Sequence, residues 1–289
     1  MNLSTLLAES GPIIADGAWG TQLTSRGLSG DVPEAWNLTH PDVVATVAQD
    51  YVNAGAQIIL SNTFGGSRIK LAKGGHSDVA ELNRAGAQIS REAAGSRALV
   101  FASIGPTGEL IGLTSTYTEQ EIEDVFADQV AAILEGDPDG FVIETFADLT
   151  EAKCALRAVQ GQCDLPVAVS LTFDEGRRGP ATLMGVTPQE AAEELTAAGA
   201  DLVGANCGGL SDDGWEQVIR IMKAHTDRPI WAKANAGIPQ LIGGKSVFPM
   251  GPEAFAALGK RLAAAGAKVI GGCCGTSPAH IAALVAALR

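Results

Sequence analysis

Two adjacent cysteines near the end of the sequence, Cys273 and Cys274, are the residues best suited to chemistry. They lie between glycines in the segment 271–276, directly after the mostly apolar run 267–270. Neighbouring cysteines rarely form a disulfide with each other, because its geometry would be strained. Two thiolates suit a single zinc ion, which needs at least one more protein ligand. The pair therefore predicts a metal site whose remaining ligand comes from elsewhere in the chain.

The elements that would position such a ligand are eight short apolar runs, each followed by polar or glycine residues. Nearly continuous apolar runs of this length are typical of strands buried on both faces, as in parallel sheets. The predicted strands are 12–15, 57–60, 99–103, 140–143, 166–171, 201–205, 229–234 and 267–270.

Helical patterns lie between these runs. Thr187-Pro188 begins one of them with a cap residue and a proline at the first helical position, and Ala-Gly-Ala ends three of them at 54–56, 198–200 and 265–267. The predicted helices are 41–54, 79–94, 119–135, 149–159, 188–198, 212–224, 252–264 and 278–288.

Eight alternations of strand and helix predict an α/β fold of the (β/α)8 TIM-barrel type, as a single domain over residues 1–289. A doubly wound open sheet is the alternative. It would normally have fewer strands and a glycine-rich nucleotide turn after the first, whereas the turn at 16–21 reads Asp-Gly-Ala-Trp-Gly-Thr.

In such a barrel, functional residues lie at the carboxyl ends of the strands. Cys207 follows the sixth predicted strand, and Cys273 and Cys274 follow the eighth, so one strand separates them on the same rim. Three thiolates form an open zinc site with a fourth position for water or substrate, which is the catalytic pattern. The alternative is three unrelated buried thiols.

Two carboxylates, Asp16 and Glu144, follow the first and fourth predicted strands. A buried carboxylate there needs a partner. One interpretation is an ion pair that stabilises the rim. The other is recognition of a substrate ammonium group. The four histidines, by contrast, fall in predicted loops and helices.

The overall composition excludes several other classes of protein. The 289 residues include 46% hydrophobic and 18% charged residues, as in a globular protein with a sizeable core. A formal net charge of −13 argues against nucleic-acid and anionic-membrane partners. No apolar run is long enough for a transmembrane helix, and residues 1–10 lack a secretory signal pattern.

The cysteine count indicates a reducing compartment. Five cysteines in a long chain without a signal pattern do not predict a disulfide framework, so a cytoplasmic location with metal-binding or catalytic thiols is expected. Cys154, in a helical pattern, is expected to be a small packed hydrophobe, and Cys163 is expected to be incidental.

These motifs resemble those of the zinc-dependent homocysteine S-methyltransferases, in order and over essentially the whole chain. Within that family they are similar to the homocysteine-binding barrel of cobalamin-dependent methionine synthases and to bacterial betaine–homocysteine methyltransferase-like proteins. The segments that carry the resemblance are 16–21, 62–64, 104–109, 144–146, 206–208, 235–237 and 271–276.

The resemblance implies that Cys207, Cys273 and Cys274 bind zinc. It also implies that the amino-acid end of homocysteine is held by Asp16, Thr63 and Glu144, with Asn235 near the site. The implied reaction is attack of the zinc-bound homocysteine thiolate on a methyl group, which makes methionine.

The identity of the methyl donor is less well indicated by the sequence than the metal ligands and the thiol substrate. A quaternary ammonium donor such as betaine requires an aromatic cage. Betaine-using members of the family have tyrosines where this chain has Gly65 and Thr145, so that Trp36 and Trp19 remain as aromatic walls. The chain contains no cobalamin or folate module. We therefore expect a methylated corrinoid protein, charged from methyltetrahydrofolate, as donor, with betaine or another small methylated donor as the alternative.

Two further alternatives are proteins that are not methyltransferases. The glycines at 271–272 and the helix from Pro278 resemble the anion site of phosphate-binding barrels, in which the cysteines would be incidental. In the second alternative, the chain is a zinc-binding regulatory or scaffold subunit without catalytic activity.

Overall fold

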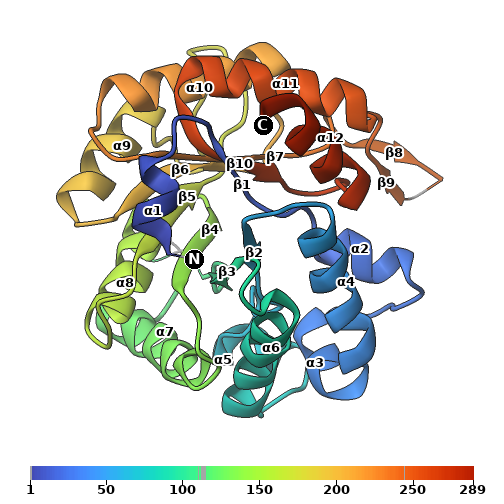
Figure 1. Cartoon of the computed structure of the whole chain (residues 1–289). Coiled ribbons are helices and arrows are strands. Elements are labelled where there is room, and N and C mark those ends of the chain that lie inside the picture. The colour runs from blue at the N-terminus through green and yellow to red at the C-terminus, as the bar shows by residue number, and fades with distance from the viewer. Residues whose placement is uncertain (1, 110, 112–114, 244) are drawn as a thin grey trace.

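Eight parallel strands form a barrel surrounded by helices, which confirms the predicted (β/α)8 class (Figure 1). The computed structural model describes residues 2–109, 111, 115–243 and 245–289, so Met1 of the predicted domain lies outside the described residues. In spatial order the strands are β1 (Ile13–Ile14), β10 (Ala267–Gly272), β7 (Ile230–Ala234), β6 (Leu202–Asn206), β5 (Val167–Leu171), β4 (Gly140–Phe146), β3 (Leu99–Ile104) and β2 (Ile58–Leu60).

The barrel closes between β1 and β2. Ala15 and Ile58 form a parallel bridge there, and the backbone N–H of Asp16 donates to the carbonyl of Ile58 at 2.9 Å. The N–H of Gln57 donates to the carbonyl of Ile14 at 2.7 Å. Closure leaves the sheet without a free edge and brings the first strand beside the last.

All eight predicted helices are present. They are α4 (Pro41–Asn53), α6 (Val79–Ala94), α7 (Glu119–Leu134), α8 (Leu149–Gln160), α9 (Pro188–Ala197), α10 (Asp212–Ala224), α11 (Pro252–Ala265) and α12 (Pro278–Leu288). Thr187 and Glu190 form a reciprocal capping box at the start of α9. The predicted glycine stops Gly55, Gly199 and Gly266 all have positive φ, which confirms their left-handed role.

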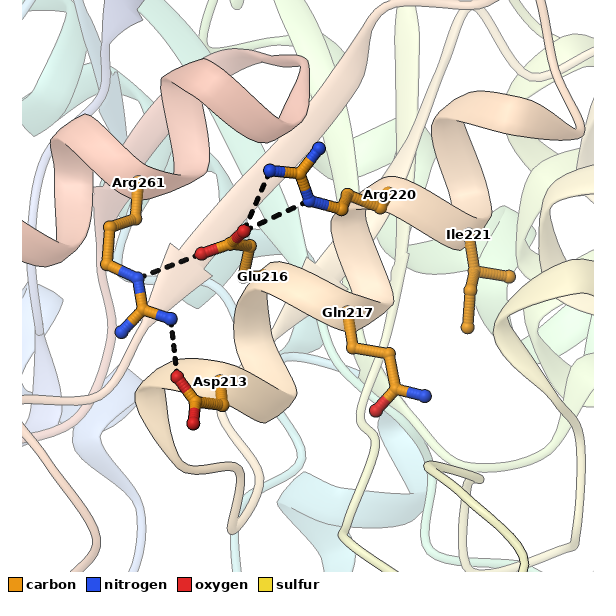
Figure 2. Close-up of a pocket in the computed structure, with 6 residues that line it drawn as sticks. All are labelled: Asp213, Glu216, Gln217, Arg220, Ile221 and Arg261. Carbon is orange, nitrogen blue, oxygen red and sulfur yellow. Dashed lines mark hydrogen bonds and ion pairs between the residues drawn. The ribbon is translucent and has the colours of Figure 1, made fainter.

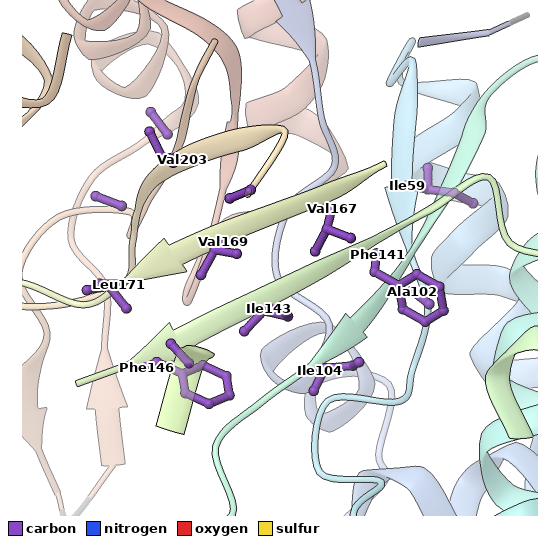
Figure 3. Packing of buried hydrophobic residues seen from close by; sticks show 14 of the residues in the cluster. Ile59, Ala102, Ile104, Phe141, Ile143, Phe146, Val167, Val169, Leu171 and Val203 are labelled. Carbon is purple, nitrogen blue, oxygen red and sulfur yellow. The ribbon is translucent and has the colours of Figure 1, made fainter. Parts of the chain in front are cut away.

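Strand residues alternate between two hydrophobic layers. The outward residues, such as Ile143 and Val169, form one cluster with buried residues of the helices. Figure 3 shows these side chains along the strands. The inward residues fill the barrel, where Phe101 and Trp231 stack with ring centroids 5.8 Å apart. Burying one such side chain contributes about 1.5–3 kcal/mol, so the two layers hold the strand ends in place.

Several elements were not expected from the sequence. Helix α1 (Leu3–Ala8) places Leu6 against the inner barrel core, and Figure 1 shows it across one end of the barrel. The other additions are α2 (Gly20–Ser25), η1 (Pro33–Ala35), α3 (Trp36–Thr39), α5 (Arg68–Lys73) and the hairpin of β8 (Gln240–Ile242) and β9 (Lys245–Val247). These pieces are too short to show a period. In the part of the chain that the structure describes, no helix is long and apolar enough to cross a membrane.

Candidate functional site

A polar layer lies directly above the apolar filling of the barrel, at the carboxyl ends of the strands. Side chains at every second position of a strand point to the same face. The polar residues two positions after the inward Phe101, Val142, Ala168 and Trp231, and four positions after the inward Leu202, therefore also point inward. This layer consists of Ser103, Glu144, Ser170, Asn206 and Lys233, and all five residues are buried.

The three predicted cysteines meet at this end of the barrel. The sulfur atoms of Cys207, Cys273 and Cys274 all lie within 4.8 Å of one another, in an arrangement that could hold a metal ion. Two backbone hydrogen bonds fix the segments that carry them: the N–H of Cys207 donates to the carbonyl of Lys233 at 3.1 Å, and the N–H of Cys273 donates to that of Ala234 at 2.7 Å. Strand β7 therefore sets the spacing of the cluster.

The turn at Cys207 has an unusual backbone. Cys207 has φ of 60°, and Gly208 follows with φ of 72°. A left-handed conformation costs a non-glycine residue roughly 1–2 kcal/mol. A Cβ atom on Gly208 would lie 2.1 Å from the carbonyl oxygen of Phe173, so only glycine fits there. The strained turn aims the Cys207 sulfur at the other two.

Asn206 links the cysteine cluster to β4 and β5. Its side-chain oxygen accepts from the N–H of Thr145 and the hydroxyl of Ser170, both at 2.8 Å. Its amide nitrogen donates to the hydroxyl of Thr145 at 2.7 Å and lies 3.9 Å from the sulfur of Cys273. An N–H group aimed at sulfur favours the thiolate over the thiol.

The three cysteine thiols differ in pKa. Hydrogen bonds from Cys273 and Cys274 lower the pKa of Cys207 to about 3. The hydrogen bond to Cys207 raises the pKa of Cys274 to about 12, and the pKa of Cys273 is raised well above its ordinary value for the same reason. The cluster thus carries one thiolate stabilised by two thiols, a set of soft donors ready for a cation.

Asp16 forms a buried ion pair with Lys233. Its Oδ1 lies 2.5 Å from the Lys233 ammonium, and its Oδ2 accepts from the N–H of Leu60 at 2.7 Å and the indole N–H of Trp19 at 2.8 Å. Burial opposes the charge on Lys233, but Asp16 and Glu144 outweigh burial and raise its pKa, so the lysine stays protonated. The structure therefore contains the ion pair of the first interpretation, and the contact of Asp16 with a substrate stays a prediction.

Glu144 faces the barrel mouth with a weaker set of partners. Its Oε1 accepts from the hydroxyl of Ser103 at 2.7 Å, and its exposed fraction is 7%. Burial raises the pKa of its carboxyl group, against the opposing effect of Lys233. A buried carboxylate of this kind gains from a second cation, which a substrate ammonium group can supply.

Thr63 and Asn235 are also brought to this end of the barrel. The hydroxyl of Thr63 donates to the carbonyl of Ser103 at 2.7 Å and is engaged by Ser61 at 2.6 Å, so it supports the strand beside Glu144. The amide nitrogen of Asn235 donates to the carbonyl of Gly208 at 2.9 Å. Its Oδ1 is buried and has no partner among the described residues.

Lys233 was not predicted as a site residue. Its signal was a lysine inside the otherwise apolar strand 229–234, which is unusual for a strand buried on both faces. The structure shows that it points into the barrel and supplies the partner of Asp16.

The aromatic residues considered for a donor cage are largely occupied. Trp36 is buried in the outer core, and the indole N–H of Trp19 is bonded to Asp16. At Gly65, the space for a side chain is limited by the Glu34 carboxylate, whose oxygen would lie 3.0 Å from an added Cβ.

A separate hollow lies over α10 and α11 (Figure 2). Its charged residues satisfy one another: Arg261 pairs with Asp213 at 2.5 Å and with Glu216 at 2.9 Å, and Arg220 pairs with Glu216 at 2.8 Å. The contacts of Arg261 join the two helices, and together with the pair within α10 they neutralise the charges without a ligand.

The protein is an α/β barrel, and three cysteines at its mouth are arranged so that they could hold a metal ion. A family model described as homocysteine S-methyltransferase matches residues 13–288. The chain belongs to this homocysteine S-methyltransferase family.

The chain is similar to methionine synthases from Mycobacterium tuberculosis (32% identical) and Mycobacterium leprae (31% identical). Each match covers 96% of this chain and 24% of the relative, so the chain spans about a quarter of their length. Among solved structures, the metallated form of the homocysteine methyltransferase MmuM from Escherichia coli matches with a TM-score of 0.82. The two proteins are 22% identical, and the match covers 98% of each chain.

Proposed function

We propose that this protein transfers a methyl group to the sulfur of homocysteine, which makes methionine, at a zinc ion held by Cys207, Cys273 and Cys274. The observation that carries the proposal is the convergence of the three sulfur atoms within 4.8 Å at the mouth of a barrel of this family.

The donor set fits zinc. Tetrahedral zinc with Zn–S bonds of about 2.3 Å places its sulfur ligands roughly 3.8 Å apart, which lies within the spread of this cluster. Three thiolates leave a fourth position open, as in catalytic rather than structural sites. The amide of Asn206 beside Cys273 would orient the ligand set from outside.

Only about 3% of a free thiol is ionised at pH 7, and the thiolate is the nucleophile. When bound, zinc supplies the charge that lowers the pKa of the substrate thiol, so a general base is unnecessary. The role of this chain is to position the substrate. Glu144 binds its ammonium group, and Ser103 holds Glu144 at 2.7 Å. Thr63 acts through Ser103, and Asn235 through the turn at Gly208.

We propose a methylated corrinoid protein as the methyl donor, in a reaction located in the cytoplasm, where thiols remain reduced. The relatives that carry the name methionine synthase support this choice. The small residue at Gly65 and the burial of Trp36 disfavour an aromatic cage for betaine.

The phosphate-barrel alternative finds less support. The N-terminus of α12 is capped from within, because the N–H of Ser277 donates to His280 at 3.2 Å and its hydroxyl contacts the same ring nitrogen at 2.9 Å. The hydroxyl of Thr276 is likewise engaged, by the N–H of Ala18 and the carbonyl of Cys273.

The test is methionine formation by zinc-loaded protein with methylcobalamin, betaine and S-methylmethionine in parallel, together with metal analysis. We expect about one zinc per chain, lost in Cys207→Ala and retained in the control Cys163→Ala, and turnover with methylcobalamin. Brisk turnover with betaine alone would overturn the donor assignment. Full zinc without homocysteine binding would favour a non-catalytic subunit, and no zinc would favour the phosphate barrel.

A further inference from the structure

Lys233 lies at the floor of the barrel mouth, where the apolar filling ends. It follows Trp231 on the inward face of β7, and its exposed fraction is 1%. A lysine in this position lowers the stability of the fold unless its charge is paired or binds a ligand. An apolar residue would pack there without the free-energy cost of removing a charge from water.

Asp16 is the only bonded partner of the Lys233 ammonium among the described residues. An ammonium group has three N–H donors, so two of them have no acceptor in this part of the structure. Buried donors are almost always paired. The remaining donors therefore have the capacity to bind an anionic group that enters the mouth.

Asp16 itself has little capacity left. Its two oxygens already receive the ammonium of Lys233, the N–H of Leu60 and the indole N–H of Trp19. Glu144 differs, because within the described residues its carboxylate has one hydrogen bond, from Ser103. The next cation to enter would be attracted to Glu144 rather than to Asp16.

The charges of this floor are therefore arranged as a receptor for a zwitterion. The negative charge of Asp16 and the positive charge of Lys233 neutralise each other, and Glu144 adds one negative charge that is not in an ion pair. An α-amino acid carries one ammonium and one carboxylate, which match the open capacity of Glu144 and of Lys233 respectively. Its thiol would extend toward the cysteine cluster, which is adjacent to Lys233 because the N–H of Cys207 donates to the Lys233 carbonyl at 3.1 Å.

We propose that Lys233 determines specificity for an α-amino acid by binding the carboxylate of the thiol substrate, while Glu144 binds the ammonium group. This inference rests on the proposed function, because it names the part of homocysteine that each charge recognises. The competing role is purely structural: Lys233 would do no more than neutralise Asp16.

Three thiols separate these roles when their binding to the zinc-loaded protein is measured by calorimetry. They are homocysteine, 3-aminopropanethiol, which lacks the carboxylate, and 4-mercaptobutanoate, which lacks the ammonium group. The variant Lys233→Gln removes the charge, and the double variant Asp16→Asn with Lys233→Gln removes it without leaving Asp16 unpaired. Zinc content and thermal unfolding are recorded for each protein.

The single variant Asp16→Asn is the reference for the double variant, because Asp16 is itself expected to lie at the amino-acid end of the substrate. Relative to this reference, we expect the double variant to bind homocysteine and 4-mercaptobutanoate about tenfold more weakly, since a charged hydrogen bond is lost. Its affinity for 3-aminopropanethiol should stay within about twofold of that of Asp16→Asn. The matched control Glu144→Gln should show the reverse, with weaker binding of homocysteine and 3-aminopropanethiol and little change for 4-mercaptobutanoate. If Lys233→Gln does not fold, the double variant decides the question.

Equal losses for all three thiols, or an affinity of the double variant for homocysteine equal to that of Asp16→Asn, would overturn the role of Lys233 and leave the methyltransferase proposal standing. Failure of the wild-type protein to bind any of the three thiols would overturn both proposals.

Discussion

The ammonium of Lys233 lies 2.5 Å from the carboxylate of Asp16, although 217 residues separate them in the chain. The contact crosses the barrel interior from β7 to the end of β1, two strands that the last strand, β10, separates. It joins the early part of the chain to the late part at the floor of the mouth. The stability of the site should therefore depend on this pair.

Asp16→Ala is expected to lower the free energy of unfolding by about 3–5 kcal/mol, because Lys233 would remain buried without a counter-charge. The matched control is Glu135→Ala, which removes the exposed partner of Arg84 and should cost less than about 1 kcal/mol. Chemical denaturation of both variants measures the difference. If both variants lose the same free energy of unfolding, the buried pair contributes no more to stability than an exposed one.

Removal of metal should make Cys207 the most reactive thiol. Its pKa is lowered to about 3 by its two cysteine neighbours, so it is a thiolate at neutral pH, whereas burial raises the pKa of Cys154 to about 11. After chelation, iodoacetamide should label Cys207 first and leave Cys154 unmodified. Mass spectrometry of tryptic peptides locates the label, and added zinc should protect Cys207. Labelling that ignores zinc would argue against a shared metal at this cluster.

Gly208→Ala should loosen the metal centre beyond the cost of its backbone angle. The new methyl group would meet the carbonyl oxygen of Phe173, and the turn that holds Cys207 would have to shift. We expect at least tenfold weaker zinc affinity, measured by competition with a chromophoric chelator. Gly75→Ala is the control, since Gly75 also has positive φ but an added Cβ there meets nothing within 4 Å. The control should cost about 1 kcal/mol of stability and leave zinc affinity unchanged.

Glu151 should make the protein less stable as the pH rises from about 4.5 toward neutrality. Its carboxylate accepts from the N–H and the hydroxyl of Thr107, at 2.8 Å and 2.5 Å, and burial nevertheless raises its pKa. The folded state then holds the proton more tightly than the unfolded state. Both states are protonated at the acid end, and the cost of burying the charge is complete once the pH exceeds the folded pKa.

Glu151→Gln removes this titration and keeps an acceptor for Thr107. Compared with wild type, its free energy of unfolding should vary less between pH 4.5 and 7, as followed by urea denaturation at each pH. Identical slopes for the two proteins would show that Glu151 does not titrate in this window.

The fold class and the position of the cysteine cluster could both be predicted from the amino-acid sequence. Eight apolar runs alternating with helical patterns leave few arrangements other than a (β/α)8 barrel, and in that barrel the ends of the sixth and eighth of these runs lie one strand apart. Cys207, Cys273 and Cys274 could therefore be placed together before any coordinates were known, and the structure brings their sulfur atoms within 4.8 Å.

The pairing of the charges at the floor of the mouth, by contrast, could be seen only in the folded structure. Strands buried on both faces read as continuous apolar runs, so their inward and outward residues cannot be told apart from the sequence. That is why Lys233 was not predicted as a site residue, and why both an ion pair and a substrate contact were considered for Asp16. Pairing across the barrel depends on closure of β1 against β2 and β10, a long-range event that no local pattern contains.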